Sequence, residues 1–222
     1  AGAVDESPAL AGISHFIEHM LFKGTEQRTA KQIAEDIDKI GGQINAFTSK
    51  ESTCYYVKAL ASNLEKACDV LVDMYCNSVF DEGEMQKEKN VVIEEIKMVE
   101  DTPEDDAHDL VYEVLFQNQP LAKSILGTVE TLTSITGDSI RSYMREEYTR
   151  DSIVISVCGN FDEDRVCAFF EGKLAHLVGR ATVGRGGQLL QARAHLGLGQ
   201  HLVQGCVDLL DHGARRARQR RG

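Results

Sequence analysis

The sequence predicts an α+β fold, in which helices pack on an antiparallel sheet. Several segments carry apolar residues at intervals of three and four positions, as amphipathic helices do. Residues 43–48 alternate between polar and apolar side chains, and residues 53–60 are rich in β-branched and aromatic ones, so the two segments are expected to form one hairpin. Because no helix separates these strands, an α+β fold is favoured over a doubly wound parallel sheet.

The first predicted helix is apolar on one side and stops near Gly24, a residue type that commonly ends helices. The turn Asp5-Glu6-Ser7-Pro8 leads into it. Its apolar residues recur at helical spacing: Leu10, Ile13, Phe16, Ile17, Met20 and Leu21.

This helix also carries a candidate metal site. His15 and His19 lie four residues apart, so their rings share one face of the helix, and Glu18 lies at the edge of that face. Two imidazoles and a carboxylate that converge from one helical turn can bind zinc and place a base beside a water on the metal. A third protein ligand must then come from elsewhere in the chain.

The second predicted helix covers residues 30–40, with Thr29 as its N-cap and Gly41-Gly42 at its end. The hairpin follows and turns at Lys50-Glu51. The apolar stripe of the helix consists of Ile33, Ile37 and Ile40.

The rest of the chain is predicted to be mainly helical. Residues 121–136 are expected to form a loop with one helical turn near Val129, and residues 151–159 a buried strand. Thr102-Pro103 separates two helices, because proline cannot continue a helix from within. Helices are predicted at residues 63–77, 81–100, 103–116, 138–148 and 162–174. The core-facing set of the long helix 81–100 is predicted to be Val91, Val92, Ile96 and Val99.

The long helix at residues 81–100 offers two candidates for the third metal ligand. Glu88 and Glu95 are seven residues apart, which is two helical turns, so they share a face. A carboxylate from this helix would complete a set of two His and one Glu, with the fourth position left for water. Glu18 would then take the proton of that water and pass it to the leaving amine of a peptide bond.

The motif His15-x-x-Glu18-His19, with an interval of 76 residues (95 − 19) to Glu95, resembles the pitrilysin/insulinase family of zinc metallopeptidases. The similarity is greatest to bacterial processing-protease members and to the mitochondrial processing peptidase β-subunit. It covers residues 1–173. It includes the segments Leu21-Phe22-Lys23-Gly24-Thr25, Gly41-Gly42-Gln43-Ile44-Asn45-Ala46-Phe47-Thr48 and Glu94-Glu95-Ile96.

The resemblance implies a two-layer sandwich of helices on a mostly antiparallel sheet, as in the N-terminal half of such a metallopeptidase, here with its first strand truncated. It implies that His15, His19 and Glu95 bind Zn²⁺ and that Glu18 is the general base. Glu88 resembles the acid that supports the orientation of a ligand.

The resemblance also implies partners. Asn45, Ala46 and Phe47 match the edge strand along which the family pairs an extended peptide substrate. Family members have a homologous C-terminal half that contributes substrate-holding residues, so a C-terminal half or a homologous subunit is the second expected partner. Two functions stay open: a zinc-dependent endopeptidase, or a non-catalytic peptide-binding or scaffold subunit, which includes an inactive truncated fragment.

Charge and composition exclude other classes of function. Residues 174–222 hold eight Arg and two Asp, a net charge of +6. The whole chain has a net charge of −11, so residues 1–173 carry −17. The acidic part argues against a nucleic-acid partner. No apolar run is long enough to span a membrane and no signal peptide is recognisable, so no membrane partner is expected. Six cysteines without a CxxC pair predict reduced thiols and a cytoplasmic location.

Two regions are predicted: a zinc metallopeptidase domain at residues 1–173 and an atypical tail at residues 174–222, rich in Gly, Arg and Leu. Residues 175–222 lack Ile, Phe, Tyr, Lys, Glu, Asn, Ser, Met and Pro. That composition is typical of a GC-rich reading frame translated out of register, which makes a non-native tail the favoured interpretation. The alternative is a tail that binds anionic surfaces through residues 215–221.

Overall fold

The computed structural model describes residues 1–177, so the predicted tail lies outside the described residues from position 178 onward. The chain divides into two compact units: residues 1–154 and 161–177 belong to the larger one, and residues 155–160 are the described part of the other. In chain order, the elements are η1 (Ala3–Asp5), η2 (Pro8–Leu10), α1 (Ile13–Leu21), α2 (Ala30–Lys39), β1 (Gln43–Thr48), β2 (Thr53–Lys58), η3 (Ala61–Asn63), α3 (Leu64–Asn77), α4 (Glu82–Glu100), α5 (Pro103–Leu115), η4 (Pro120–Ala122), α6 (Val129–Ser134), α7 (Gly137–Glu147) and α8 (Glu163–Lys173), where η marks a 3-10 helix.

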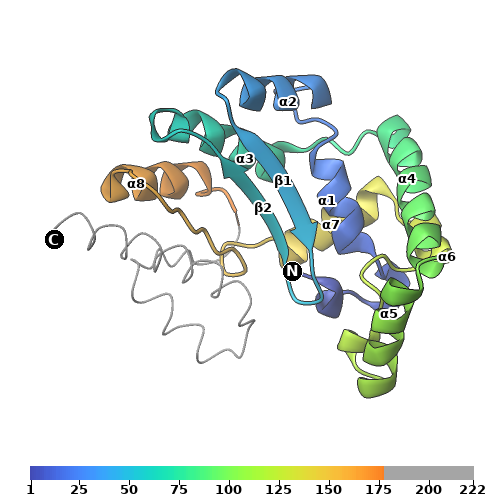
Figure 1. Cartoon of the computed structure of the whole chain (residues 1–222). Helices are drawn as coiled ribbons and strands as arrows, with labels where there is room; N and C mark the ends of the chain where they lie inside the picture. The colour runs from blue at the N-terminus through green and yellow to red at the C-terminus, as the bar shows by residue number, and fades with distance from the viewer. Residues whose placement is uncertain (178–222) are drawn as a thin grey trace, which may run out of the picture. The chain divides into compact units, whose positions relative to one another are not determined.

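The larger unit is mostly helical, with one small antiparallel sheet formed by β1 and β2 (Figure 1). The strands pair in register from Gln43 opposite Lys58 to Thr48 opposite Thr53. Both α1 and α2 contact β1, and α3 contacts β2. This arrangement confirms the predicted α+β class, with helices packed on an antiparallel hairpin. Among the described helices, none combines the length and the apolar character that crossing a bilayer requires.

Helix α1 lies in the hydrophobic core. Phe16 and Ile17 are fully buried, and burial of one such side chain stabilises the folded state by about 1.5–3 kcal/mol. The buried residues of α1 are Ile13, Ser14, Phe16, Ile17, Met20 and Leu21. Because these side chains pack into the core on most sides of the helix, the backbone of α1 is fixed, and with it the positions of His15, Glu18 and His19.

The N-terminus of α1 is capped by a side chain from outside the helix. Glu6 is buried, and its carboxylate accepts hydrogen bonds from the backbone N–H groups of Gly12 and Ser14, at 2.7 and 2.9 Å. Burial raises the pKa of Glu6, and these two backbone bonds oppose that rise. The N-cap residue, Gly12, has no side chain that could accept these hydrogen bonds, so the carboxylate of Glu6 satisfies the backbone donors instead.

Two backbone segments cross at the start of α1 without a side chain between them. Gly12 has a φ of +90° and Gly127 a φ of +72°. A Cβ atom on Gly12 would lie 2.4 Å from the carbonyl oxygen of Leu126, and one on Gly127 would lie 2.2 Å from that of Ala11. Both glycines are therefore required by the close approach and by the backbone conformation.

Helix α2 follows its prediction closely. The side chain of Thr29 accepts a hydrogen bond from the backbone N–H of Gln32, which makes Thr29 the N-cap. The predicted stripe is buried, with Ile33 and Ile37 each 2% exposed and Ile40 9% exposed. The sequence therefore located both the start of this helix and the face that it buries.

A polar network fixes the loop between α1 and α2. The guanidinium group of Arg28 donates to Asp36, Asp69 and Asp73, at 3.2, 2.8 and 2.6 Å. Asp73 is buried and also accepts a 2.7 Å hydrogen bond from the hydroxyl of Thr25. The network ties the loop to α3, which carries Asp69 and Asp73.

Two sequence predictions are wrong. Residues 151–159 form no strand, and Val154 and Ile155 are 53% and 36% exposed. A strand needs a neighbouring strand for its backbone groups, and the sheet within residues 1–177 contains β1 and β2 alone. In α4, Val92 and Ile96 are buried as expected, but Val91 is 46% exposed because it is turned about 100° from Val92 around the helix.

Candidate metal centre

The structure brings His15 and His19 of α1 together with Glu95 of α4. The Nε2 atoms of the two histidines lie 3.3 Å apart. Oε2 of Glu95 lies 3.7 Å from Nε2 of His15 and 3.5 Å from Nε2 of His19. One ligand atom from each residue lies within 4.8 Å of the other two.

These distances fit a tetrahedral zinc ion. Two imidazole nitrogens about 2.0–2.1 Å from zinc, at a tetrahedral angle, are about 3.3 Å from each other. The Nε2 atoms of His15 and His19 are separated by that distance, and the two distances to Glu95 are slightly longer. Two imidazoles and one carboxylate are also a donor set that zinc accepts with its fourth position open.

Glu88 occupies a different place from Glu95, although the sequence offered both as ligands. Its Oε1 lies 2.8 Å from Nδ1 of His19, and its Oε2 lies 2.5 Å from Nζ of Lys23. A carboxylate at Nδ1 accepts a hydrogen bond from the ring and leaves Nε2 without a proton, which is the form that coordinates a metal. Glu88 therefore orients His19, while Glu95 faces the two Nε2 atoms.

The electrostatics of His15 also suit a metal ligand. Burial, and to a lesser extent the nearby charge of His19, lowers the pKa of His15 to about 4. The imidazole is therefore neutral at neutral pH, as coordination requires. Its Nδ1 is buried and has no hydrogen-bond partner within residues 1–177.

Glu18 is held beside the metal centre by the end of β1. Its Oε2 accepts a 2.5 Å hydrogen bond from the hydroxyl of Thr48. Burial raises the pKa of Glu18, and the hydrogen bond from Thr48 opposes that rise; the charge of His19 also lowers this pKa and that of Glu95 raises it. No sequence pattern predicts this role of Thr48, because a side chain 30 residues from Glu18 reaches it only through the fold.

The three residues expected to bind a peptide lie along β1. Asn45 is exposed, and its Oδ1 accepts a 2.9 Å hydrogen bond from the backbone N–H of Ala46. Phe47 is 47% exposed, with its ring centre 6.5 Å from that of Tyr56. Within the described sheet β1 pairs with β2 on one side, which leaves its other edge unpaired.

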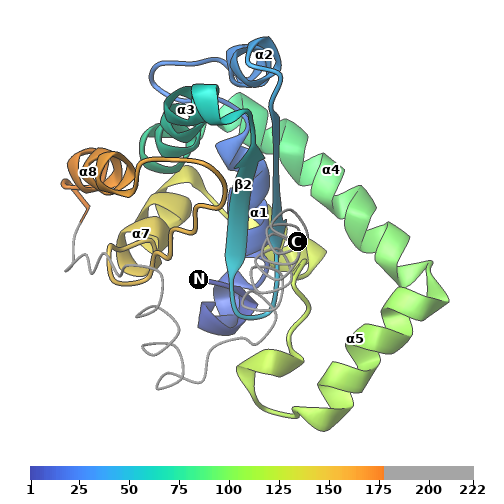
Figure 2. The same ribbon diagram turned by 60° about the vertical axis from the view of Figure 1, so that its left-hand side comes forward.

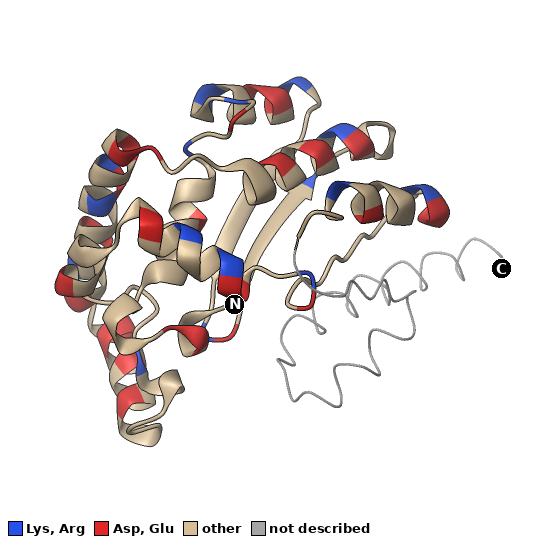
Figure 3. Ribbon diagram, turned by 180° about the vertical axis from the view of Figure 1, so that it is seen from behind, with Lys and Arg blue, Asp and Glu red and all other residues tan. Residues whose placement is uncertain are grey.

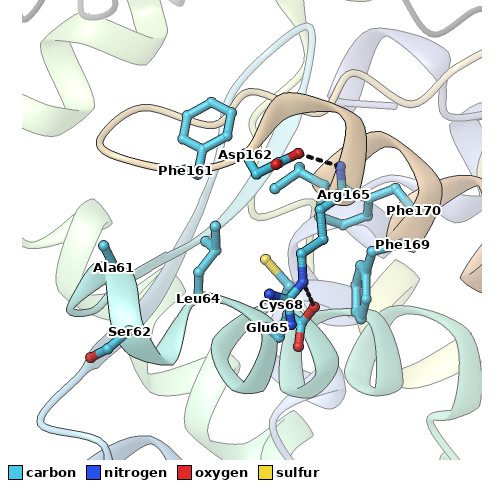
Figure 4. Close-up of a pocket in the computed structure, with 11 residues that line it drawn as sticks. Ala61, Ser62, Leu64, Glu65, Cys68, Phe161, Asp162, Arg165, Phe169 and Phe170 are labelled. Carbon is cyan, nitrogen blue, oxygen red and sulfur yellow. Dashed lines mark hydrogen bonds and ion pairs between the residues drawn. The ribbon is translucent and has the colours of Figure 1, made fainter.

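Two hollows in the described residues lie away from the candidate metal centre. A cavity of about 150 Å³ lies between α3 and α8, where the guanidinium group of Arg165 pairs with Glu65 at 2.6 Å (Figure 4). A second hollow of about 450 Å³ lies between α2 and the start of β1 and is lined in part by Asn45 and Tyr56. The side chains of His15, His19 and Glu95 are 13%, 17% and 33% exposed, so the candidate ligand set is partly open to solvent.

Comparison with known proteins identifies related sequences. Residues 1–129 match the profile of the insulinase family, peptidase family M16. The chain is 56% identical over 162 residues to a zinc protease of Bacillus subtilis named YmxG and described as uncharacterized, covering 73% of this chain and 40% of the relative. It is 39% identical over 166 residues to the probable β subunit of the mitochondrial-processing peptidase of Arabidopsis thaliana, covering 75% of this chain and 31% of that protein.

Solved structures share the fold. A protease from Helicobacter pylori superposes with a TM-score of 0.75 at 21% identity, over 84% of this chain and 44% of that one. A domain from Pseudomonas fluorescens, described as an inactive M16 peptidase domain, gives a TM-score of 0.74 at 17% identity, over 83% of this chain and 45% of that one. The chain thus spans less than half the length of the relatives that it matches. Zinc is the cofactor of these peptidases. The profile match and the sequence identities show that this chain belongs to the insulinase family, peptidase family M16.

Proposed function

We propose that the chain is the catalytic part of a zinc-dependent endopeptidase that hydrolyses peptide bonds of short or extended peptides. His15, His19 and Glu95 would hold the zinc ion. The observation that carries the proposal is the convergence of one ligand atom from each of these residues within 4.8 Å. Glu18 lies close enough to be influenced by the charges of His19 and Glu95, so a base is available beside the ligand set.

The residues divide the work of hydrolysis between them. A bound zinc ion supplies a Lewis acid that polarises a peptide carbonyl and acidifies a water molecule. Glu18 takes the proton of the attacking water and returns it to the leaving amine, while Thr48 holds the carboxyl group through its hydroxyl. Glu88 keeps the imidazole of His19 in the orientation that presents Nε2.

The unpaired edge of β1 would bind the substrate as an added strand. The backbone N–H of Ser49 donates to the carbonyl of Ser52. In an antiparallel pair, hydrogen-bonded and non-hydrogen-bonded residue pairs alternate, so Ala46 and Tyr55 form a non-hydrogen-bonded pair. This alternation turns the backbone N–H and C=O of Ala46 away from β2. The N–H of Ala46 is bonded to the side chain of Asn45, so an extended peptide would replace that bond and pair along the edge beside Phe47.

A Glu18→Gln variant of the full chain tests this proposal. The variant is expected to keep its zinc, because Glu18 is not among the three ligands, and to lose cleavage of a fluorescence-quenched peptide. The assay is run with the chain alone and with the C-terminal part of the Bacillus subtilis relative added as a separate polypeptide. Cleavage by the variant at the rate of the parent chain would exclude Glu18 as the base. A parent chain that stays metal-free after incubation with zinc would exclude the ligand set.

A second function is favoured by the coverage of the relatives. Because the chain spans about 40% of the Bacillus subtilis relative, it would act as a non-catalytic peptide-binding or scaffold subunit if the remainder supplies essential residues. In that case the chain alone binds zinc and peptide but cleaves nothing. An inactive truncated fragment would regain cleavage when a C-terminal half or homologous subunit is added, whereas a non-catalytic subunit would not. The cytoplasm is the proposed compartment, because no disulfide joins the cysteines within residues 1–177 and the cytoplasm keeps thiols reduced.

A further inference from the structure

Helix α5 carries an apolar stripe that no other part of the described chain covers. The spacing i, i+3, i+4, i+7 and i+8 is the one that amphipathic helices use to face a protein core. In α5 the four large side chains at these positions are 50–68% exposed, and the helix contains no buried residue. The α5 stripe consists of Ala107, Leu110, Val111, Val114 and Leu115.

The opposite face of α5 is the one that anchors the helix. Nζ of Lys50, in the hairpin turn, lies 3.4 Å from Oδ1 of Asp109 and 4.9 Å from the ring centre of Tyr112. Lys50 also donates a hydrogen bond to the carbonyl of Lys123 at 2.6 Å. The hairpin turn therefore contacts both α5 and the segment that follows it. At 100° per residue, Asp109 and Tyr112 lie on the other side of the helix from the α5 stripe.

The position of α5 leaves the stripe accessible within the larger unit. Helix α4 ends at Glu100 and α5 begins at Pro103, and the two helices meet at an angle there (Figure 2). Contiguous exposed apolar surface of this kind marks a site of protein or membrane interaction. None of the residues of the α5 stripe belongs to the metal centre or to β1.

The charges of α5 decide between the classes of partner. Five acidic residues and no Lys or Arg lie in the helix (Figure 3). By helical rotation, Asp106 and Glu113 follow one edge of the α5 stripe, and Glu104 lies near the other. Helices that bind anionic membranes carry Lys and Arg on the polar face, so a membrane does not fit. Two copies of α5 packed face to face would bring like charges together, which disfavours a homodimer through this stripe.

We propose that the α5 stripe docks a helix of a protein partner, apolar along one side and flanked by Lys or Arg. Residues such as Leu110 and Val114 would act as anchors that pack between the apolar side chains of the partner. The basic flanks of the partner would pair with Asp106 and Glu113. This surface extends the function of the chain beyond peptide hydrolysis, since it binds a partner away from the proposed substrate edge.

A pair of designed helical peptides tests the proposal. The basic probe has Leu at the spacing of the α5 stripe and Lys on both flanks; the acidic probe has the same Leu positions and Glu on both flanks. Binding to the full chain is measured by fluorescence anisotropy of the labelled probes. The basic probe is expected to bind at least tenfold more tightly than the acidic one, and its binding is expected to weaken as salt is raised.

Matched variants show whether the stripe is the site. Leu110→Ser with Val114→Ser is expected to weaken the basic probe at least tenfold. Val91→Ser with Met98→Ser removes exposed apolar side chains from α4, outside the stripe, and is expected to leave binding unchanged. Equal melting temperatures of both double variants show that folding is intact, because all four side chains are exposed.

Several results would overturn the proposal. Equal affinity for the basic and acidic probes would show that charge does not select the partner. Equal loss of probe binding in both double variants would show that the α5 stripe is not the binding site. Self-association that the Leu110→Ser, Val114→Ser variant abolishes would identify a second copy as the occupant. Binding to phosphatidylserine vesicles that depends on the same residues would identify a membrane. None of these results depends on zinc or on Glu18, so they leave the proposed peptidase function untouched.

Discussion

Oε1 of Glu88 lies 2.8 Å from Nδ1 of His19, so a carboxyl group of α4 controls which nitrogen of an α1 histidine is free to bind a metal. The other oxygen of Glu88 is paired with Lys23 at 2.5 Å. Glu88 is buried, and this double pairing compensates the cost of burying its charge. The relationship makes Glu88 a positioning residue whose effect on the metal can be measured.

Replacement of Glu88 by Gln is expected to lower the affinity for zinc about 10- to 100-fold, because groups that orient a metal ligand typically contribute that much. The variant keeps the shape of the side chain but removes its charge. Affinity is measured by competition with a coloured chelator. The matched control is Glu94→Gln, a carboxyl that is 73% exposed in the same helix and pairs with Lys97. Equal zinc affinities of the Glu88→Gln variant and the parent would refute this role.

Zinc is expected to raise the melting temperature of the chain. At a free zinc concentration 100 times the dissociation constant, binding adds about 2.7 kcal/mol to the free energy of unfolding. For a chain of this size that corresponds to a shift of about 5–10 °C. Differential scanning calorimetry with zinc and with a chelator measures it. His15→Ala is expected to abolish the shift, and His108→Ala, an exposed histidine of α5, to preserve it. A shift that survives in His15→Ala would place the metal elsewhere.

Substitution of Gly12 by Ala is expected to destabilise the fold by at least about 3 kcal/mol. The new Cβ would lie 2.4 Å from a backbone oxygen, and the φ of +90° is unfavourable for any residue with a side chain. Urea denaturation measures the loss. Gly172→Ala in α8 is the control, because a Cβ there meets no atom within 4 Å and Ala favours the helix by up to about 1 kcal/mol. If both variants unfold at the same urea concentration, the crossing at Gly12 does not limit stability.

Substitution of Arg28 by Met is expected to reduce the free energy of unfolding by about 3–5 kcal/mol, because it leaves the buried carboxylate of Asp73 without its cation. Arg141→Met provides a control, since Arg141 pairs with an Asp138 that is 94% exposed and such pairs contribute at most about 1 kcal/mol. Chemical denaturation of both variants at pH 7 measures the difference. A loss at position 28 no larger than at position 141 would contradict the prediction.

The loss of stability in the Arg28→Met variant is expected to depend on pH. Hydrogen bonds from Lys39 and then Arg28 lower the pKa of Asp36. Burial raises the pKa of Asp69, but hydrogen bonds from Lys173 and Arg28 outweigh it, so that pKa is also lowered. A carboxyl with a lowered folded-state pKa contributes stability above its unfolded pKa of about 3.9 and loses it as the pH falls through the folded value. The difference in stability between Arg28→Met and the parent is therefore expected to shrink below about pH 4. A difference that stays constant from pH 7 to pH 3 would argue against these ion pairs.

Local signals in the sequence were sufficient to predict the main helices and the hairpin. Thr29 and the stripe of Ile33 and Ile37 located α2, because N-caps and apolar periodicity act within a few residues. The predicted strand at 151–159 failed for the opposite reason. Its β-branched residues favour an extended chain, but a strand forms only against a neighbour, and no local pattern specifies that neighbour.

The candidate site was predictable only in part. The ligand set and Glu18 were assigned from a motif and a family resemblance, and the structure brings the three ligand atoms together. Thr48 and Glu6 were missed, because each acts on α1 from a different segment and neither has a characteristic sequence spacing. Their contributions come from side chains that meet α1 only after folding, as the hydroxyl of Thr48 meets Glu18.

The split of the ligand set between α1 and α4 has a topological consequence. His19 and Glu95 are 76 positions apart (95 − 19), yet their facing atoms are 3.5 Å apart. If His19 and Glu95 both bind a zinc ion as proposed, the chain from the end of α1 to the middle of α4 would form a loop closed by the metal, as a disulfide closes a loop. The hairpin that carries β1 lies within that loop. A single protease nick inside it would leave two fragments that a bound metal ion would hold together in addition to the core that α1 and α4 share.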